Sequence, residues 1–333
     1  MKKVIVVLAF VLAAVLALAA CGNSTAPAQK DDTPAASAGG TNQIDPVENA
    51  KVGISLPPAD NVWQAKMLTS VEAAVKNYPD IEWTINVAVD DPDQLNQLTS
   101  MKDAGYDLII ALPNDGGLMT NICEQIYDAG VYTIILDRDI ASGKYTSYVG
   151  GDNPGAGRGG AEFIGEFLGG EGKIATLRCY AGSPSDLDIN NNFMEVLGSK
   201  YPGIEVVVEG DGEYDSQHGL DAMSNILPAY DHLDAVFAQD DEAALGAMTA
   251  IDNANRTDIK LIVGIGGKTE AYEQIKADNT IFKCSMTYLP EMGVDAVIMA
   301  VRILSGEEFS VDEIIESVSV TKENVDQFMD KGY

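Results

Sequence analysis

The sequence predicts an α/β fold with two doubly wound parallel-sheet lobes that follow one another along the chain. Short apolar runs typical of buried strands alternate with helical patterns of about a dozen residues, which indicates βαβ units around a parallel sheet. The alternation starts again after residue 150. A glycine-rich cluster at residues 150–155 separates the two series, and its composition suits a hinge.

The first half contains four strand patterns with helical patterns between them. The strands are expected at residues 51–56, 81–89, 108–112 and 131–136. The helices are expected at residues 62–77, 91–103 and 117–129. A segment at residues 145–150 then carries the chain across to the second half.

The second half repeats the alternation. Its strands are expected at residues 173–179, 204–208, 235–238, 260–263 and 280–287. Its helices are expected at residues 158–168, 185–200, 215–227, 241–253 and 269–278. One more helix at 290–304, rich in Met, Val and Ile, and a short strand at 317–321 come after this series is complete.

The start of the chain predicts the compartment. Two lysines precede an apolar run at residues 4–20, which is the pattern of a secretory signal peptide. The run ends in Leu-Ala-Ala-Cys, similar to the processing site of bacterial lipoproteins, and this likeness implies cleavage before Cys21 and lipidation of its sulfur. The alternative, a membrane-spanning anchor, usually needs roughly 20 apolar residues, more than this run offers.

Residues 23–49 predict a flexible tether, because they are rich in Ala, Thr, Ser, Gly, Pro and Asp and offer almost no bulky apolar side chain to a core. Together with residues 4–20 and Cys21, they predict an extracytoplasmic protein held at the bacterial cell membrane by its lipid alone.

Charge and cysteine content exclude several classes of protein. The formal charge is −30, from 51 acidic and 21 basic residues, and such a surface repels nucleic acid and anionic lipid headgroups. The four cysteines match neither a zinc ribbon nor a redox motif. With Cys21 set aside an odd number remains, so a disulfide framework is not indicated. Cys179 and Cys284 lie in predicted strands, where we expect core packing and leave their pairing open.

No pattern predicts catalysis. The two histidines, His218 and His232, lie near no serine or cysteine at a motif spacing, and no nucleophile elbow or metal-ligand spacing occurs. Glycines at 155, 157 and 160 formally match a dinucleotide fingerprint, but no acid ends the next strand. We therefore expect a binding protein without a cofactor or a metal, and not an enzyme.

Three acids mark the junction between the strand at 235–238 and the helix at 241–253. In an open α/β sheet, ligands bind at the carboxyl ends of strands, so Asp240 is expected to present its carboxylate to a ligand. Asp241 and Glu242 fall in the first helical turn, where the helix dipole favours negative charge. The alternative is that all three acids only cap the helix.

Other polar and aromatic residues follow strands in the same way. Asp137 and Arg138 follow the strand at 131–136 and offer a hydroxyl acceptor and a rigid donor fork, or else a surface ion pair. Trp63, Tyr214 and Tyr288 offer flat apolar faces to a ligand. The alternatives are core packing for Trp63 and ordinary surface positions for the two tyrosines.

From residue 51 to residue 321 the chain resembles the ribose-type sugar-binding proteins of ABC importers. Residues 135–138, Ile-Leu-Asp-Arg, match their Leu-Asp-Arg motif, in which both polar residues hold the sugar. Asp240 stands at the position of an Asn that binds sugar hydroxyls, and Tyr214 stands at the position of an aromatic plate. The resemblance implies that these residues, with Asp137 and Arg138, bind the ligand.

The resemblance also covers the first loop and the hinge. Ser55 falls at a polar position of the first strand, and Asp60 and Trp63 fall at an Asn and an aromatic position of the loop that follows. Tyr288 replaces a polar Gln next to the hinge. These four residues are added to the expected ligand-binding set.

Three positions depart from the pattern. Leu187, with Asp186 beside it, stands where the relatives have an Arg, and Leu112 replaces an Asn. Gly266 replaces an Asp. These losses argue against ribose itself: Gly266 is expected to leave room for a larger or differently decorated sugar, and an extra acid such as Asp186 would welcome an amino or cationic group.

The resemblance implies a type I periplasmic-binding-protein-like architecture with a multi-strand hinge, in which the last helix returns to the first lobe. The expected organisation is a signal peptide at 1–20 and a lipidated tether at 21–50. The N-terminal lobe is then 51–150 plus 289–316, and the C-terminal lobe is 151–288 plus 317–333.

The sequence patterns and the resemblance are compatible with two functions. The favoured one is a monomeric solute-binding lipoprotein that takes a monosaccharide or sugar-like polyol in the interlobe site and delivers it to ABC permease subunits. The alternative is a sensory accessory protein that presents such a molecule to a membrane receptor kinase, since one fold serves many functions.

Overall fold

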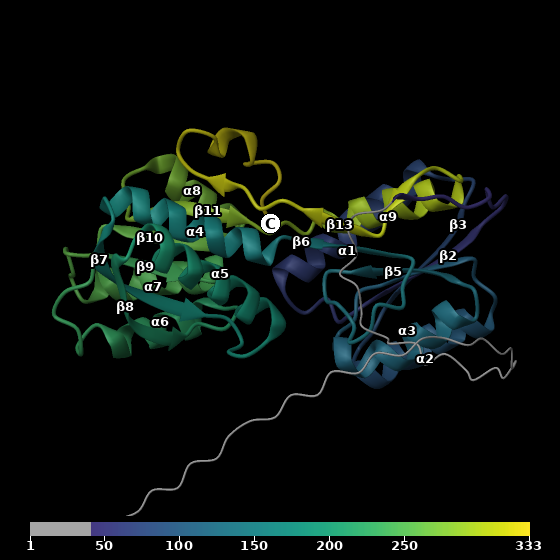
Figure 1. Cartoon of the computed structure of the whole chain (residues 1–333), viewed down its shortest axis with the longest axis horizontal. Coiled ribbons are helices and arrows are strands. Elements are labelled where there is room, and N and C mark those ends of the chain that lie inside the picture. The colour runs from purple at the N-terminus through teal and green to yellow at the C-terminus, as the bar shows by residue number, and fades with distance from the viewer. Residues whose placement is uncertain (1–40) are drawn as a thin grey trace, which may run out of the picture. The chain divides into compact units, whose positions relative to one another are not determined.

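The computed structural model describes residues 41–333, and it confirms the predicted fold class. Two six-stranded sheets, each flanked by helices, make up this part of the chain (Figure 1). The expected signal peptide, the lipidated Cys21 and most of the expected tether lie outside the described residues.

The first sheet is wholly parallel and has the order β13-β6-β5-β4-β2-β3. Its strands are β2 (Lys51–Leu56), β3 (Glu82–Val87), β4 (Leu108–Ala111), β5 (Tyr132–Leu136), β6 (Ser147–Gly151) and β13 (Asp312–Ile315). The central strand β4 is Leu-Ile-Ile-Ala and is buried at every position. A fully apolar run of this kind suits a parallel strand that is covered on both faces.

Helices cover both faces of the first sheet. On one face lie α1 (Val62–Ala74), which continues as the 3-10 turn Val75–Asn77, and α9 (Met292–Leu304). On the other face lie α2 (Asp91–Asp103) and α3 (Gly116–Asp128). The helix α9 follows the second sheet in sequence but packs in the first core, as the resemblance implied.

The second sheet has the order β14-β11-β10-β9-β7-β8 and is parallel except for β14. Its strands are β7 (Glu171–Arg178), β8 (Gly203–Asp211), β9 (Ala235–Ala238), β10 (Leu261–Gly266), β11 (Phe282–Thr287) and β14 (Ser319–Val320). On one face lie α4 (Asn153–Leu168) and α5 (Pro184–Lys200). On the other lie α6 (Ser216–Ile226), α7 (Asp241–Asn253) and α8 (Thr269–Ala277).

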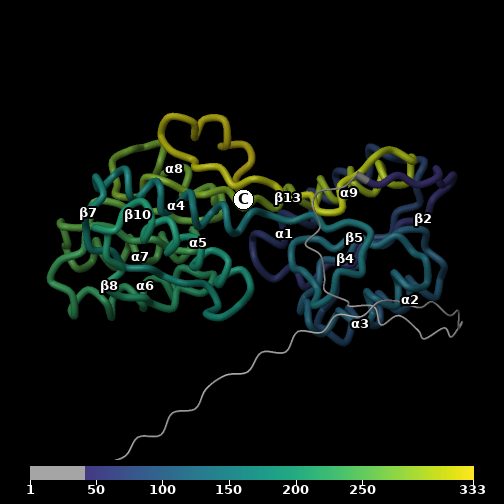
Figure 2. Tube along the Cα trace, viewed as in Figure 1, coloured from purple at the N-terminus to yellow at the C-terminus, as the bar shows by residue number. Residues whose placement is uncertain are grey.

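The chain passes between the two sheets three times. It does so from β6 to α4, from β11 to α9, and from β13 to β14, and Figure 2 lets the reader follow each passage. The segment at 145–150, expected only as a crossing, forms β6 as an interior strand of the first sheet. The strand β13 was not expected, and neither was the small ribbon of β1 (Thr41–Asn42) and β12 (Phe309–Ser310).

Side-chain caps set where several helices begin. Asp90, Asp115, Asp152 and Asp215 each accept a hydrogen bond from a backbone N–H in the first turn of the helix that follows. Such caps satisfy backbone donors that the helix leaves free. With Asp152 as its cap and a proline in its first turn, α4 begins at Asn153, five residues before the predicted start.

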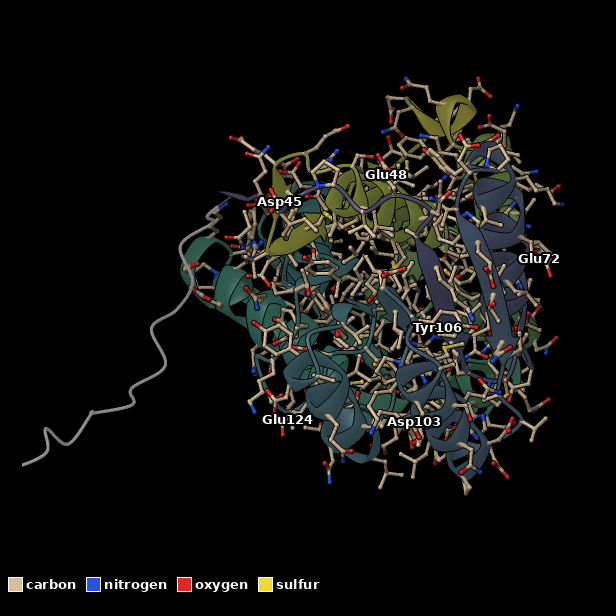
Figure 3. All side chains as sticks on the ribbon, turned by 90° about the vertical axis from the view of Figure 1, so that its right-hand side faces the viewer. Asp45, Glu48, Glu72, Asp103, Tyr106 and Glu124 are labelled. Carbon is tan, nitrogen blue, oxygen red and sulfur yellow. The ribbon has the colours of Figure 1, made fainter. Side chains whose placement is uncertain are left out.

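The surface of the first lobe carries many of the acids. The labelled residues Asp45, Glu48, Glu72 and Asp103 are exposed, and Glu124 is half-buried (Figure 3). Cys179 and Cys284 are buried and unpaired, as is Cys123. Within residues 41–333, no helix combines the length and the apolar character that crossing a membrane requires.

Candidate functional site

Tyr288 joins the two lobes at the carboxyl ends of their strands. Its backbone N–H, just after β11, donates to the carbonyl of Gly266 at 2.7 Å. Its hydroxyl donates to Asp137 Oδ1 at 2.6 Å, and its carbonyl accepts from Trp63 Nε1 at 3.0 Å. Position 151 must be glycine, since a Cβ there would lie 2.3 Å from the Tyr288 ring. Tyr288 thus connects β10 and β11 with helix α1 and with the loop after β5 in the first lobe.

Asp137 is held with one oxygen free. The residue has φ of 61°, a left-handed conformation that Asp tolerates better than most residues. The Tyr148 hydroxyl donates to its carbonyl at 2.7 Å, and Tyr288 occupies Oδ1. Burial raises the pKa of Asp137, while Arg138 and the Tyr288 hydroxyl act against the rise. No described residue donates to Oδ2, which is therefore available to accept from a ligand hydroxyl.

Arg138 follows Asp137 in the chain, and Trp63 contacts the same tyrosine as Asp137 does. Arg138 is exposed and donates to the carbonyl of Asn114 at 2.8 Å. The alternative of a surface ion pair with Asp137 is not seen, since no salt bridge joins these two residues in the described part of the chain. Trp63 stacks on Tyr288 with ring centroids 6.3 Å apart, and it also packs against the first core. Trp63 therefore packs in the core, as the alternative had it, and also contacts Tyr288.

The other two first-lobe residues lie differently. Asp60 is exposed in the loop before α1. Ser55 is completely buried, and its hydroxyl donates to Gln97 at 3.2 Å. The expected ligand contact of Ser55 is not available in this structure because none of its surface is exposed.

Tyr214 presents an aromatic face from the second lobe. It is 43% exposed, meets Tyr180 edge to face at 5.0 Å, and shares a hydrogen bond with the Ser185 hydroxyl at 3.2 Å. Tyr214 thus remains partly exposed beside Tyr180.

Asp186 forms its hydrogen bonds within the second lobe. It is completely buried, and it forms a two-point ion pair with Arg178, with distances of 2.7 Å and 2.6 Å. The backbone N–H of Gly182 also donates to it at 2.7 Å. The expectation that Asp186 binds a ligand directly is wrong for this arrangement, because both oxygens are occupied and neither is accessible. Arg178, which sequence reasoning missed, supplies the counter-charge.

The acids at the β9–α7 junction have three different roles. Asp240 caps α7, with Oδ1 accepting from Glu242 at 2.7 Å and Ala243 at 3.2 Å. Burial and the neighbouring carboxylate of Asp241 raise the pKa of Asp240 to about 8. No described residue donates to Asp240 Oδ2. The residue therefore caps the helix with one oxygen and leaves the other free.

Asp241 and Glu242 do not face a ligand. Asp241 is completely buried, and its Oδ2 accepts from the backbone of Gly267 and Lys268 and from the Ser285 hydroxyl, at 2.7, 3.0 and 2.8 Å. Burial raises the pKa of Asp241 to about 6. Glu242 pairs with Lys268 at 2.9 Å. These two acids tie α7 to the loop after β10 and to β11.

Gly266 is buried at the end of β10 with φ of 147°, a conformation that favours glycine. A Cβ on this residue would lie 2.6 Å from the Tyr333 hydroxyl oxygen. The expectation that Gly266 leaves room for a larger sugar is therefore wrong, because the phenol of Tyr333 fills the space.

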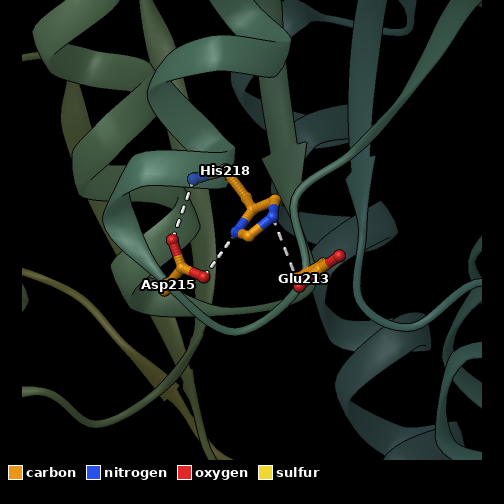
Figure 4. A group of neighbouring side chains, drawn as sticks. All are labelled: Glu213, Asp215 and His218. Atoms are coloured by element: carbon orange, nitrogen blue, oxygen red, sulfur yellow. Dashed lines mark hydrogen bonds and ion pairs between the residues drawn. The ribbon is translucent and has the colours of Figure 1, made fainter.

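One group of side chains has the composition of a metal site. Glu213, Asp215 and His218 lie within 4.8 Å of one another at the start of α6, next to Tyr214 (Figure 4). Asp215 caps α6 through the backbone of His218 at 2.9 Å, and its other oxygen contacts the His218 ring. The adjacent Asp215 raises the pKa of His218. These contacts describe an ion-paired helix start rather than an open coordination site.

Direct hydrogen bonds thus bring together Trp63, Asp137 and Tyr288, and Gly266 joins them through Tyr288. Asp240 belongs to the neighbouring strand, since β9 pairs with β10. Sequence reasoning missed Tyr148 and Tyr333. In the sequence, Tyr148 is an aromatic residue in a strand, and Tyr333 is an aromatic residue at the last position. Neither feature is specific to a binding site.

Comparisons with known proteins agree with this arrangement. Residues 52–308 match the model of the periplasmic binding protein domain family, and the chain belongs to that family. This is a family of binding proteins, in agreement with the prediction that the chain is not an enzyme.

Individual relatives are more distant. The chain is similar to the ribose import binding protein of Bacillus subtilis, with 27% identity over 68% of this chain and 72% of that protein. A solute binding protein of Bacillus halodurans with bound myo-inositol has a TM-score of 0.76 and 27% identity, covering 85% of this chain and 98% of that one. A fructose binding periplasmic domain of a hybrid two component system has a TM-score of 0.73 and 27% identity, covering 84% and 93%.

Proposed function

We propose that the protein is the solute-binding lipoprotein of an ABC importer, and that it binds a monosaccharide or sugar-like polyol at the carboxyl ends of the strands of both sheets. The observation that carries the proposal is the set of contacts around Tyr288, which binds Asp137 so that one carboxylate oxygen stays free and which stacks on the ring of Trp63. A neutral polyhydroxylated ligand needs fixed acceptors and flat apolar faces of this kind.

The contacts assign roles to individual residues. Asp137 and Asp240 each offer one unoccupied carboxylate oxygen to ligand hydroxyls, and Arg138 offers donors. Trp63 and Tyr214 offer ring faces. Asp60, Gly266 and Tyr288 border the same strand ends. Ser55 and Asp186 act behind this surface, as supports for the residues that touch the ligand.

The rest of the chain serves delivery. Cleavage after residue 20 and a lipid on Cys21 would hold the protein outside the cytoplasm. The last part of the expected tether, residues 41–50, packs on the first lobe through the β1–β12 pair and the buried Ala50, so the proposed tether is the stretch before residue 41. The lobes, 51–150 plus 289–316 and 151–288 plus 317–333, would close about the three crossings, since hinge closure is a common response to ligand. The closed monomer would then dock on permease subunits.

The relatives support a small polyhydroxylated ligand. Proteins similar to this chain are described as binding ribose, myo-inositol and fructose. A panel of pentoses, hexoses, cyclic polyols and amino sugars, screened by thermal shift and followed by calorimetry, tests the proposal. A true ligand at about a hundred times its dissociation constant stabilises by about 2.7 kcal/mol.

Asp137→Asn and Trp63→Ala should each weaken binding of the ligand found in that panel, whereas Asp103→Asn, an exposed acid at the end of α2, should not. Saturable binding should also reduce the radius of gyration in solution scattering. Failure of the whole panel to bind the wild-type protein would overturn the proposal.

A second function is supported by one observation. The fructose binding relative is a periplasmic domain of a hybrid two component system, so a similar fold can present a sugar to a receptor. Crosslinking of the sugar-bound protein in its own membranes separates the two functions. Recovery of permease subunits supports import, and recovery of a receptor kinase supports sensing.

A further inference from the structure

The last residue of the sequence lies at the carboxyl ends of the second-lobe strands. The backbone N–H of Tyr333 points to the carbonyl of Gly267, and its carbonyl accepts from Thr269 at 3.0 Å. Upstream, Phe328 packs edge to face on Tyr272 of α8 at 6.4 Å, and Val325 is buried in the second core. In Figures 1 and 2 this end of the chain is marked near β11 and the passage to β13. The segment after β14 therefore packs on the second lobe and brings Tyr333 to Gly266.

The phenol of Tyr333 occupies the place of a missing side chain. Its oxygen lies 2.6 Å from where a Cβ of Gly266 would be. Gly266 is one hydrogen bond from Tyr288, and Tyr288 is one hydrogen bond from Asp137. A group that projects over Gly266 is therefore next to the surface assigned above to the ligand.

The Tyr333 hydroxyl is not used within the described part of the chain. No residue from 41 to 333 makes a side-chain hydrogen bond to it, and it is not one of the completely buried polar atoms without a partner. The ring itself is half-buried. A held ring with an accessible, uncommitted hydroxyl is the arrangement that orients a ligand in a binding site.

The charges nearby keep this hydroxyl protonated. Burial and the carboxylates of Asp240, Asp241 and Glu242 raise the pKa of Tyr333 above its usual range. The phenol can therefore donate a hydrogen bond to a ligand oxygen at physiological pH. A ligand hydroxyl can accept this hydrogen bond.

We propose that Tyr333 is a ligand-contacting and specificity-determining residue, which donates to one ligand hydroxyl and closes the corner over Gly266 against any larger substituent. The proposal rests on the sugar-binding function proposed above and narrows it: the ligand is a compact monosaccharide or cyclic polyol with a bare hydroxyl at that corner. An N-acetylated sugar or a disaccharide extended from that corner is excluded.

Two variants of the full chain test the two parts of the proposal. Tyr333→Phe keeps the ring and removes the donor, and it should weaken binding of the best ligand of the panel by about tenfold, the size expected for one lost hydrogen bond. Tyr333→Ala opens the corner and should gain binding of N-acetylglucosamine or a disaccharide that wild type rejects. Tyr127→Phe, the same change on an exposed tyrosine of α3, is the matched control and should bind as wild type does.

Monodeoxy analogues of the best ligand give the sharpest readout. One of them should bind wild type and Tyr333→Phe equally, because it lacks the hydroxyl that Tyr333 contacts, while the others should keep the tenfold difference. If Tyr333→Ala does not fold, which the loss of its thermal unfolding transition would show, then Tyr333→Phe and the analogues still test the role of Tyr333.

The outcomes separate this proposal from the one it rests on. Wild type that binds a sugar, with Tyr333→Phe unchanged for every analogue, overturns the role of Tyr333 and leaves sugar binding intact. Tight binding of N-acetylglucosamine by wild type overturns the closed corner. Absence of any sugar binding by wild type overturns the proposed function itself.

Discussion

The two lobes hold the acids near their strand ends in different ways. In the first lobe, Asp137 receives hydrogen bonds from two tyrosines, Tyr148 at its carbonyl and Tyr288 at one carboxylate oxygen, and keeps the other oxygen free. In the second lobe, Asp186 and Asp241 are completely buried. Both oxygens of Asp186 bind Arg178, while Oδ2 of Asp241 accepts from a serine and two backbone N–H groups and its Oδ1 has no partner among the described residues. Asp240 combines the two arrangements, since it caps α7 with one oxygen and leaves the other free.

The difference follows from what each lobe must hold in place. The first lobe orients its carboxylate with tyrosines, one of which belongs to the crossing from β11 to α9. The second lobe carries acids in the first turns of α5 and α7, and burying Asp186 and Asp241 there requires donors for their oxygens. We infer that each lobe supplies one ring face and one carboxylate to the ligand, and that the first lobe adds the donors of Arg138.

The largest effect on stability is expected when the buried ion pair of the second lobe is broken. Arg178→Met leaves the buried Asp186 carboxylate without its cation, which should lower the free energy of unfolding by about 3–5 kcal/mol. The control is Arg138→Met in the first lobe, where an exposed arginine makes one hydrogen bond to a backbone carbonyl, and the loss should stay below about 1 kcal/mol. Urea unfolding measures both, and similar losses would remove the contrast between the lobes.

The next effect concerns the joint between the lobes. Tyr288→Phe removes the hydroxyl that donates to Asp137 and leaves a partly buried carboxylate without that donor, at a cost of about 1–3 kcal/mol of stability. Ligand affinity should fall as well, since Asp137 loses its orientation. Tyr180→Phe changes an exposed tyrosine that makes no side-chain hydrogen bond to the described residues, and should alter neither quantity. Calorimetry and urea unfolding measure the two quantities.

A smaller effect appears in the pH dependence of the second lobe. The folded-state pKa of Asp240, about 8, exceeds the ordinary value of 3.8, so between these limits the folded chain holds a proton that the unfolded chain has released. Stability therefore falls as pH rises from about 4 to 8, and the raised pKa of Asp241, about 6, acts in the same direction.

Asp240→Asn should flatten this slope, because Asn still caps a helix but does not titrate. At pH 9 the variant should be more stable than wild type by a margin on the order of 1 kcal/mol. Unfolding curves across this pH range test it, and a slope that the substitution leaves unchanged would assign the pH dependence to other groups.

The smallest expected effect lies at the exposed start of α6. The pKa of His218 is raised above 6.5 by Asp215, so its imidazole should titrate later than a free histidine in an NMR pH series. The stabilisation from this pair is present at low pH and is lost as pH rises through the folded-state value. Asp215→Asn should return the midpoint toward 6.5, and an unmoved midpoint would contradict the pairing.

The alternation of strands and helices could be predicted from sequence because it depends on local patterns. Apolar runs such as 108–112 and 235–238 are strands close to their expected limits, and α2 and α7 have the expected bounds. Strand β13 could not be predicted in this way, since residues 312–315 are Asp-Glu-Ile-Ile at a half-exposed edge and have no buried alternation. Its pairing with β6 depends on residues far away in sequence.

For the candidate site, the sequence by itself determined that polar and aromatic residues stand at strand ends, because residue type and strand position are local properties. Only the tertiary structure decided which of them are free. Asp137 and Asp186 are both expected from sequence to bind the ligand, but the first keeps an open oxygen and the second is enclosed by Arg178. Likewise, the space at Gly266 is filled by Tyr333, which is 67 positions away in the printed numbering. The physical reason is that burial and hydrogen-bond partners are set by packing between distant segments, which no local pattern encodes.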